Sequence, residues 1–320
     1  MKVAVVGATG IVGETILRVL AERELPVEEL GAFASEARDG GISFAGRRLD
    51  VRVPTDEALN AYDAVFFAST DDISERFVPA LLARGAVVID NSSAFRMKPD
   101  VPLVVPEVNA HFKETDRLFP VGNCTAIILC VALGPVQAAA GLKSVRVATY
   151  QAVSGAGRLA LEEFDGGQGP IIGNVVPHIG AFNTDGSTGE ERKVCEETRK
   201  ILGLPDLRIS ALTVRVPVRT AHSEAVFFET ERETTVEQLA EAFEQARGVV
   251  YHSAGAVTPR DVEDTDFVHV ARLRSSASSA HTPSDNFQMW IVGDQLRKGA
   301  ATNGVQILEM LVARGLFVPA

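Results

Sequence analysis

Residues 2–13 read KVAVVGATGIVG, an apolar β-forming run followed at once by a glycine-rich turn. A continuous apolar run predicts a strand that is buried on both faces, as in a parallel sheet. The glycines would provide a tight turn, a close backbone approach for a pyrophosphate, and close packing of the next helix on the strand. That helix begins near Val12, and its N-terminus would hold the phosphates. The alternative is a structural turn in the same fold that binds nothing.

The first half of the chain continues as alternating strands and helices. Residues 64–68 and 86–90 are apolar runs that predict strands, and residues 72–84 between them predict a helix. We expect residues 101–109 to form a further strand. This alternation predicts a parallel sheet with right-handed crossovers. Ligands bind beyond the carboxyl ends of such strands, so Arg96, which follows one of them, is either an anion clamp or an ordinary solvated arginine.

The end of the second predicted strand, residues 32–34, bears on the choice of cofactor. The acidic residue that usually binds the ribose 2′-hydroxyl is missing there; Ser35 takes its place and Arg38 follows. A hydroxyl with a guanidinium suits a 2′-phosphate, so the pair favours NADP over NAD. Because Glu36 and Asp39 stand beside them, the alternative is an ordinary charged surface loop.

The composition of the 320 residues predicts a globular protein of two domains, with 46% hydrophobic residues to build its cores. Forty-two acidic residues against 31 basic ones give a net charge of -11. This charge argues against binding to nucleic acid or a membrane surface, but not against a small anionic substrate. The three cysteines form no CxxC pair, so neither a disulfide framework nor a zinc site is predicted. Without a recognisable signal peptide or membrane span, we expect a reduced, cytoplasmic protein.

Residues 122–129, GNCTAIIL, pass from a turn-prone polar pair into an apolar run of helical character. Cys124 would then lie at or next to a helix N-terminus. There the unpaired N–H groups and the positive end of the helix dipole favour a thiolate. The alternative is a buried cysteine that merely packs.

A second helix is predicted over residues 190–202, with Ser187 or Thr188 as its N-cap and a glutamate three residues later in either register. Glu190 lies on its inward apolar stripe and Lys193 flanks it. Charged groups on an inward face need a polar partner or a ligand. The alternative is a first-turn glutamate that stabilises the helix dipole beside a solvated lysine.

Pro217 interrupts the strand predicted over residues 209–216, so Arg215 and His222 bracket an irregular segment. The imidazole pKa lies closest to neutral, which makes His222 the candidate proton shuttle. The alternative is a solvated loop histidine.

The predicted fold class is α/β, with an N-terminal Rossmann-type doubly wound domain and an α+β catalytic and dimerisation domain that has a mostly antiparallel sheet. The first domain spans residues 1–122 and is completed by a C-terminal helix within 296–320, and the second spans 123–295. Residues 165–189 predict a long loop or subunit contact. The strands expected in the second sheet are residues 145–150, 209–216, 225–228, 267–273 and 287–292.

Taken together, the chain resembles aspartate-β-semialdehyde dehydrogenase over essentially its whole length. The motifs that carry the resemblance are GATGIVG (7–13), NSSAFR (91–96), VPEVN (105–109), GNCT (122–125), YQAVSG (150–155), EERK (190–193), RVPV (215–218) with AHS (221–223), and GDQLRKGAA (293–301).

The resemblance implies NADPH-dependent conversion of aspartyl phosphate to aspartate semialdehyde and phosphate through a thioester on Cys124, in lysine, threonine and methionine biosynthesis. It implies that His222 is the general acid/base and that Gln151 orients the acyl group. Arg215 and Glu190 would hold the substrate's carboxylate and amine. The phosphate would be held by Arg96, Asn123 and Lys193. The cofactor residues would be Gly7, Thr9, Gly10, Ile11, Val12, Gly13, Ser35, Arg38, Ser69, Ser154, Gly155 and Gln295.

The resemblance also implies a homodimer or homotetramer. Two alternatives remain open at this stage. One is an enzyme similar to N-acetyl-glutamyl-phosphate reductase, against which Glu190 and the pair Gly122-Asn123 speak. The other is a non-catalytic Rossmann paralogue, against which the joint presence of four residues speaks: Cys124, Gln151, Arg215 and His222.

Overall fold

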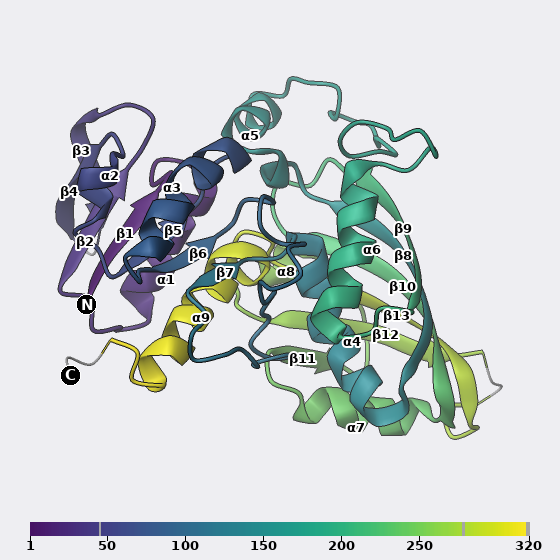
Figure 1. Cartoon of the computed structure of the whole chain (residues 1–320). Coiled ribbons are helices and arrows are strands. Elements are labelled where there is room, and N and C mark those ends of the chain that lie inside the picture. The colour runs from purple at the N-terminus through teal and green to yellow at the C-terminus, as the bar shows by residue number, and fades with distance from the viewer. Residues whose placement is uncertain (45, 277–278, 318–320) are drawn as a thin grey trace. The chain divides into compact units, whose positions relative to one another are not determined.

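The computed structural model describes residues 1–44, 46–276 and 279–317, apart from the side chains at 38–40 and 47 (Figure 1). Contacts within the chain divide it into two units. The first comprises residues 1–106, 110–122 and those from 300 onward, and the second comprises residues 107–109 and 123–299. From the sequence we expected the return to the first unit at residue 296; the contacts place it at residue 300.

The first unit is built on a seven-stranded sheet with the order β3-β4-β2-β1-β5-β6-β7 (Figure 1). Its pairs are parallel except for the antiparallel pair β3–β4, an edge hairpin of mostly polar sequence that we did not expect. The strands are β1 (Lys2–Val6), β2 (Glu29–Phe33), β3 (Arg38–Phe44), β4 (Arg47–Arg52), β5 (Ala64–Phe67), β6 (Val87–Asp90) and β7 (Leu118–Pro120). The helices are α1 (Ile11–Glu22), α2 (Asp56–Leu59), α3 (Asp71–Ala83) and α9 (Thr302–Ala313).

Helices cover both faces of this sheet, as the continuous apolar strands require. Alternate strand residues such as Val6, Val65 and Val88 pack in one core cluster with Phe77 of α3. Helices α1 and α9 contact each other, and Gly304 of α9 lies close to residues of β5 and β6 that point the other way. The unit is therefore doubly wound, which confirms the predicted fold class.

The strand predicted over residues 101–109 is wrong, because the chain there forms turns and irregular structure. Two prolines in the stretch, Pro102 and Pro106, have no N–H to donate to a ladder. Val104 and Val105 are nevertheless buried, and Asn303 Nδ2 donates a hydrogen bond of 2.9 Å to Val104 O. The apolar run is a buried connection, and its burial accounts for the misleading pattern.

The second unit has a six-stranded sheet with the order β11-β12-β13-β10-β8-β9. The three inner pairs are antiparallel and the two outer pairs are parallel, which agrees with the mostly antiparallel sheet that we predicted. Its strands are β8 (Leu142–Gln151), β9 (Arg208–Arg215), β10 (His222–Thr234), β11 (Val249–His252), β12 (Val268–Ser275) and β13 (Ser284–Gly293). Its helical segments are α4 (Cys124–Ala140), η1 (Val153–Ala156), α5 (Arg158–Asp165), α6 (Gly189–Leu202), α7 (Val236–Gln245), α8 (Pro259–Val262) and the π-helical turn η2 (Arg297–Ala301).

Helix α4 is apolar all round and occupies the core of this unit, between β10 and the helices α6 and α7 (Figure 1). The opposite face of the sheet is covered at β12 and β13, where Val262 of α8 packs against Val292 of β13. On β8, β9 and β10 the same face exposes Tyr150, Leu212 and Phe227, which lie on neighbouring strands and point the same way. No helix among the described residues is long and apolar enough to span a bilayer.

Candidate active site

Cys124 is the first residue of α4, as predicted. The N-cap is Asn123, whose Oδ1 accepts hydrogen bonds from Thr125 N (3.0 Å) and Ala126 N (3.2 Å). This cap explains why the helix starts here, because an asparagine side chain pairs with N–H groups that have no partner within the helix. The thiol therefore lies at the positive end of a 17-residue helix, where a thiolate is stabilised.

His222, 98 residues further along the chain, faces this thiol. The distance from Cys124 Sγ to His222 Nε2 is 3.6 Å, and Cys124 remains partly exposed. The other two cysteines have different settings: burial raises the pKa of both Cys130 and Cys195. Cys124 is thus the cysteine whose surroundings suit a nucleophile rather than a packed core thiol.

The protonation of His222 follows from its surroundings. The imidazole is fully buried, and burial, together with the Arg215 guanidinium, holds its pKa well below the usual value. The ring is therefore neutral. Its Nδ1 accepts a hydrogen bond of 3.1 Å from Ala152 N, which leaves the proton on Nε2, the nitrogen that faces Cys124.

Three polar side chains from three elements meet beside the thiol. Glu190 Oε1 accepts hydrogen bonds from Asn123 Nδ2 (2.9 Å) and from Gln151 Nε2 (3.1 Å). Gln151 is the last residue of β8, and its Nε2 also lies 3.4 Å from His222 Nε2. Glu190 comes from the first turn of α6, whose N-cap is Thr188 in a capping box with Glu191, one of the two registers that we predicted. The inward-facing carboxylate thus has the polar partners that its position demanded.

Arg215, the last residue of β9, supplies the positive charge of the site. Its Nη1 donates a hydrogen bond of 2.6 Å to Ala152 O. Burial lowers its pKa, whereas the charges of Cys124 and Glu190 act in the opposite direction, so the three groups lie within electrostatic reach of one another. A Cβ at Gly155 would lie 3.1 Å from His222 Cε1 and 3.2 Å from Arg215 Nη1. Only glycine leaves the imidazole and the guanidinium this close to the loop.

Gln295 has a role that the sequence did not reveal. Its Oε1 accepts a hydrogen bond of 2.8 Å from Ala221 N, and its Nε2 donates one of 2.6 Å to Ser154 Oγ. Ala221, immediately before His222, has a φ of +68°, a conformation that costs an alanine free energy. The buried amide of Gln295 therefore holds the strained backbone that leads into His222. Its predicted place near a nicotinamide stays a prediction.

The remaining residue of this group, Lys193, lies one turn beyond Glu190 on α6 and is partly exposed. No hydrogen bond or ion pair of its ammonium is found within the described chain. The second unit thus brings together nine of the residues that the sequence singled out. They are Asn123, Cys124, Gln151, Ser154, Gly155, Glu190, Arg215, His222 and Gln295.

The glycine-rich turn of the first unit has the geometry of a phosphate site. Gly7 has a φ of +85°, and a Cβ there would lie 2.1 Å from Ala68 O, so any side chain would collide with the backbone. A Cβ at Gly13 would lie 2.1 Å from Gly7 O, which shows how closely α1 packs on the turn. Gly10 is the N-cap of α1 and provides no side-chain cap. Thr9, Ile11 and Val12 complete the turn and the first helical residues.

One buried polar atom beside this turn has no hydrogen-bond partner in the described part of the chain. Ser69 Oγ, at the exit of β5, is buried and has no hydrogen-bond partner among the described residues. It directly follows Ala68, whose carbonyl is the atom that Gly7 approaches. A bound nucleotide would supply the missing partner, so the residues present fit a dinucleotide.

The cofactor-selectivity residues are described only in part. Ser35 is exposed and lies two residues after the end of β2. Arg38 is the first residue of β3, and its side chain lies outside the described part of the chain. The preference for NADP over NAD therefore stays a prediction.

Arg96 lies in a loop that is tied to the sheet and to α3. It is 8% exposed and its Nη2 donates a hydrogen bond of 2.8 Å to Asn91 O. Asp71, in the first turn of α3, accepts hydrogen bonds of 2.7 Å from both the N and the Oγ of Ser93. Asp90 holds Ser92 from the strand below, through bonds of 3.0 and 2.6 Å. The two aspartates, which the sequence did not mark as important, shape the loop that carries Arg96.

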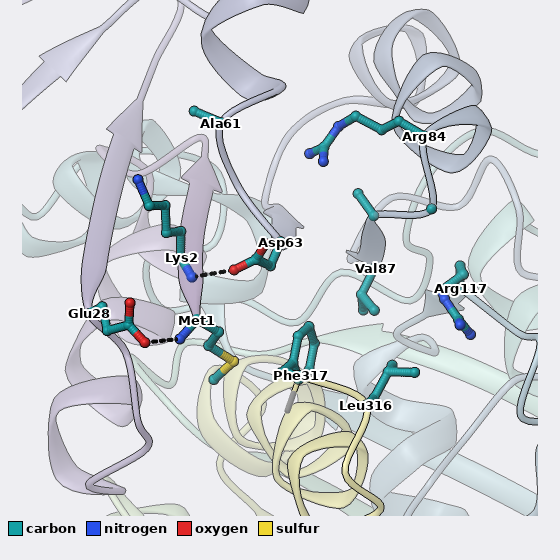
Figure 2. A pocket seen from close by; sticks show the side chains of 12 residues that line it. Met1, Lys2, Glu28, Ala61, Asp63, Arg84, Val87, Arg117, Leu316 and Phe317 are labelled. Atoms are coloured by element: carbon teal, nitrogen blue, oxygen red, sulfur yellow. Dashed lines mark hydrogen bonds and ion pairs between the residues drawn. The ribbon is translucent and has the colours of Figure 1, made fainter. Parts of the chain in front are cut away.

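A separate cavity of about 590 Å³ lies at the amino-terminal ends of the parallel strands of the first sheet. Figure 2 shows Lys2, Asp63 and Val87 at these strand ends, with Arg84, Arg117 and Phe317 around the same space. Its two carboxylates already have partners, since Glu28 pairs with the N-terminal amine and Asp63 accepts a hydrogen bond from Lys2 N. Because parallel sheets bind nucleotides at their carboxyl ends, this cavity is not assigned to the cofactor.

Two family models match the chain. One, described as "Semialdehyde dehydrogenase, NAD binding domain", matches residues 2–115, and the other, "Semialdehyde dehydrogenase, dimerisation domain", matches residues 133–298.

Individual proteins and structures are similar over almost the full length. The chain is 41% identical to a protein of Aquifex aeolicus named aspartate-semialdehyde dehydrogenase, with 99% of each chain covered. A Bacillus subtilis protein of the same name is 37% identical, with 97% of each covered. The structure of aspartate semialdehyde dehydrogenase II from Vibrio cholerae matches with a TM-score of 0.90 at 37% identity, covering 98% of each chain, and that protein has also been solved in complex with ASA.

Proposed function

This chain belongs to the aspartate-semialdehyde dehydrogenase family, and on that premise we propose that it reduces L-aspartyl-4-phosphate to L-aspartate-4-semialdehyde, with NADPH as reductant and a thioacyl intermediate on Cys124. The observation that carries the mechanism is the distance of 3.6 Å between Cys124 Sγ and the buried imidazole of His222 at the N-terminus of α4. We place the reaction in the biosynthesis of lysine, threonine and methionine, in the cytoplasm.

Cys124 opens the reaction as the nucleophile. Its sulfur forms a bond to the acyl carbon while the bond from that carbon to the phosphate oxygen breaks, and phosphate leaves with the electron pair. The N-terminus of α4 and the Arg215 guanidinium stabilise the thiolate before the attack. Lys193, Asn123 and Arg96 are the groups that we assign to the leaving phosphate.

Substrate orientation comes from charges of opposite sign. Arg215 pairs with the substrate's α-carboxylate and Glu190 with its amine, a complementary set for an amino acid. Gln151 stands between Glu190 and His222, which suits it to orient the acyl oxygen. This set also supports an aspartyl substrate over the N-acetyl-glutamyl phosphate of the alternative enzyme, because an acetylated amine carries no charge for Glu190 to bind.

The glycine turn and Ser69 would hold NADPH, which when bound would supply the hydride that the thioester carbon accepts. The Nε2–H of the neutral His222 ring donates a hydrogen bond to the oxygen of the thiohemiacetal that is formed on Cys124, and so stabilises the negative charge that this oxygen gains. When the carbon–sulfur bond breaks, the electron pair of this oxygen re-forms the carbonyl, the thiolate is regenerated and the aldehyde leaves. The hydrogen bond from Ala152 N to Nδ1 supports this assignment, because it keeps the proton of the ring on Nε2, the nitrogen that faces Cys124.

We further propose that the protein works as a homodimer, with a homotetramer as the alternative. The support is the part of the sheet face on β8, β9 and β10, where Tyr150 (38% exposed), Leu212 (54%) and Phe227 (47%) point outward. An apolar sheet face of this kind is typical of an interface.

The test is phosphate-dependent reduction of NADP by L-aspartate-4-semialdehyde, which is the same reaction in reverse. Cys124→Ser should abolish turnover while the affinity for NADPH, measured by fluorescence titration, stays close to wild type. Unchanged turnover in this variant would exclude the thioacyl mechanism. If the wild-type chain binds the nucleotide but turns over no substrate, it is the non-catalytic paralogue.

A further inference from the structure

We propose that Glu197 is a positioning residue that fixes the backbone in front of Cys124 and so aims its sulfur at His222. The proposal rests on the proposed function, in which Cys124 is the nucleophile. Glu197 lies on α6, its side chain is 1% exposed, and its Oε2 accepts a hydrogen bond of 2.5 Å from Asn123 N. It is not itself assigned a contact with substrate.

The need for an acceptor at this point follows from how helices begin. The N–H of an N-cap residue has no partner within its own helix, and Asn123 is only 6% exposed, so water does not readily replace the missing partner. The side-chain oxygen of Asn123 is already used on the first turn of α4. A buried carboxylate on the neighbouring helix is therefore the group that satisfies this N–H, through a charge-assisted bond.

The same helix holds Asn123 at a second point. Glu190 and Glu197 are seven residues apart, two turns along the inward face of α6, and they take the side-chain amide and the backbone N–H of Asn123 respectively. The carbonyl oxygen of Asn123 accepts a fifth hydrogen bond, of 2.9 Å, from Ile127 N. Each polar group of this residue is thereby paired. Since Cys124 is the next residue, the orientation of its side chain depends on α6 as much as on its own helix α4.

A carboxylate in this place also has an electrostatic consequence. Its negative charge near the sulfur opposes formation of the thiolate, against the favourable effects of the α4 N-terminus and of Arg215. Two other charged groups lie in this region. Lys200 is close enough to Glu197 for the carboxylate to act to raise its pKa, and Glu190 acts on Arg215 together with Cys124. The two roles of Glu197, acceptor and charge, can be separated because glutamine keeps an acceptor oxygen and removes the charge, whereas alanine removes both.

The test compares Glu197→Gln and Glu197→Ala with the wild-type enzyme and with the control Glu196→Gln. Glu196 is the neighbouring residue on α6 and is exposed, so the control makes the same charge change on the outer face. One readout is the pH dependence of alkylation by iodoacetamide, followed by mass spectrometry of the peptide that contains Cys124, so that Cys130 and Cys195 are counted separately. The other is kcat and KM for phosphate-dependent NADP reduction.

Glu197→Gln should lower the apparent pKa of Cys124 by about half a unit to one unit, with kcat kept within about threefold. Glu197→Ala should lower kcat about 30-fold with little change in KM for NADP, because Cys124 Sγ is no longer held in its orientation toward His222. Glu196→Gln should match wild type in both readouts.

Two results would overturn the proposal. Wild-type kcat and an unshifted alkylation profile in Glu197→Ala would exclude it. Equal losses of kcat in the Gln and Ala variants, with no pKa change in the first, would mean that Glu197 only stabilises the fold. Failure of the proposed function is a different result: alkylation of Cys124 in the wild-type enzyme would then leave turnover intact, whatever the substitutions at Glu197 do.

Discussion

Replacing Glu224 with glutamine should remove a pH-dependent loss of stability. Glu224 follows His222 by two residues on β10, its side chain is 0% exposed, and neither carboxyl oxygen has a hydrogen-bond partner among the described residues. Burial holds the pKa of Glu224 well above its ordinary value of 4.5, so the folded chain keeps this carboxyl neutral where the unfolded chain ionises it.

The size of the effect follows from proton linkage. Between the unfolded pKa and the raised folded pKa, the unfolded state binds one proton fewer, so the free energy of unfolding falls as pH rises, by about 1.4 kcal/mol per unit. The full stability is present below pH 4.5 and is lost as pH rises through the folded pKa. From pH 5.5 to 7.0 the loss attributable to Glu224 is therefore at most about 2 kcal/mol. Glutamine has nearly the same shape and does not ionise.

Urea unfolding at pH 5.5 and 7.0, at one fixed protein concentration, measures this. The free energy of unfolding of Glu224→Gln relative to wild type should rise between the two pH values, by up to about 2 kcal/mol. The control Glu233→Gln changes an exposed residue of the same strand, and its free energy of unfolding should equal that of the wild-type chain at both pH values. Since all other titrating groups are common to the variants, they cancel in the difference. If the free energy of unfolding changes by the same amount between the two pH values in Glu224→Gln and in wild type, the assignment of a neutral buried carboxyl to Glu224 is refuted.

Three further predictions concern function and assembly. Arg215→Leu should lower kcat/KM for aspartate semialdehyde about 100-fold while KM for phosphate changes less than about threefold, because only the carboxylate loses its partner; equal losses in steady-state kinetics would mean that the role is misassigned. Arg38→Ala should narrow the NADP-over-NAD ratio of kcat/KM about tenfold if the guanidinium binds the 2′-phosphate, and an unaffected ratio contradicts that prediction. Phe227→Glu should shift the sedimentation-velocity distribution from dimer to monomer at micromolar concentration, whereas the exposed control Val53→Glu should not; a wild-type monomer would exclude the proposed dimer.

Local patterns were sufficient for much of the architecture. The strand, turn and helix over residues 2–13 follow from an apolar run and three glycines, and the structure shows the steric reason at Gly7 and Gly13. The start of α6 follows from its capping box at Thr188. The apolar pattern predicted a strand over residues 101–109, and this prediction was wrong. The segment is largely apolar and Val104 and Val105 are buried, but its prolines cannot donate hydrogen bonds to a sheet. The hairpin β3–β4 was missed, although Leu49, Val51 and Val53 alternate with charged residues in the pattern that is typical of a half-buried strand.

The sequence by itself determined the two-part α/β plan, the glycine turn, the start of a helix at Cys124 and, through resemblance, the reactive residue types. These depend on neighbours within a few positions along the chain. Only the tertiary structure decided that Cys124 and His222, 98 residues apart, lie 3.6 Å from each other. It also decided which imidazole nitrogen carries the proton and that Glu197 pairs with the N–H of Asn123. Such pairings arise from packing of distant segments, which desolvates polar groups and obliges them to find partners that no local pattern specifies.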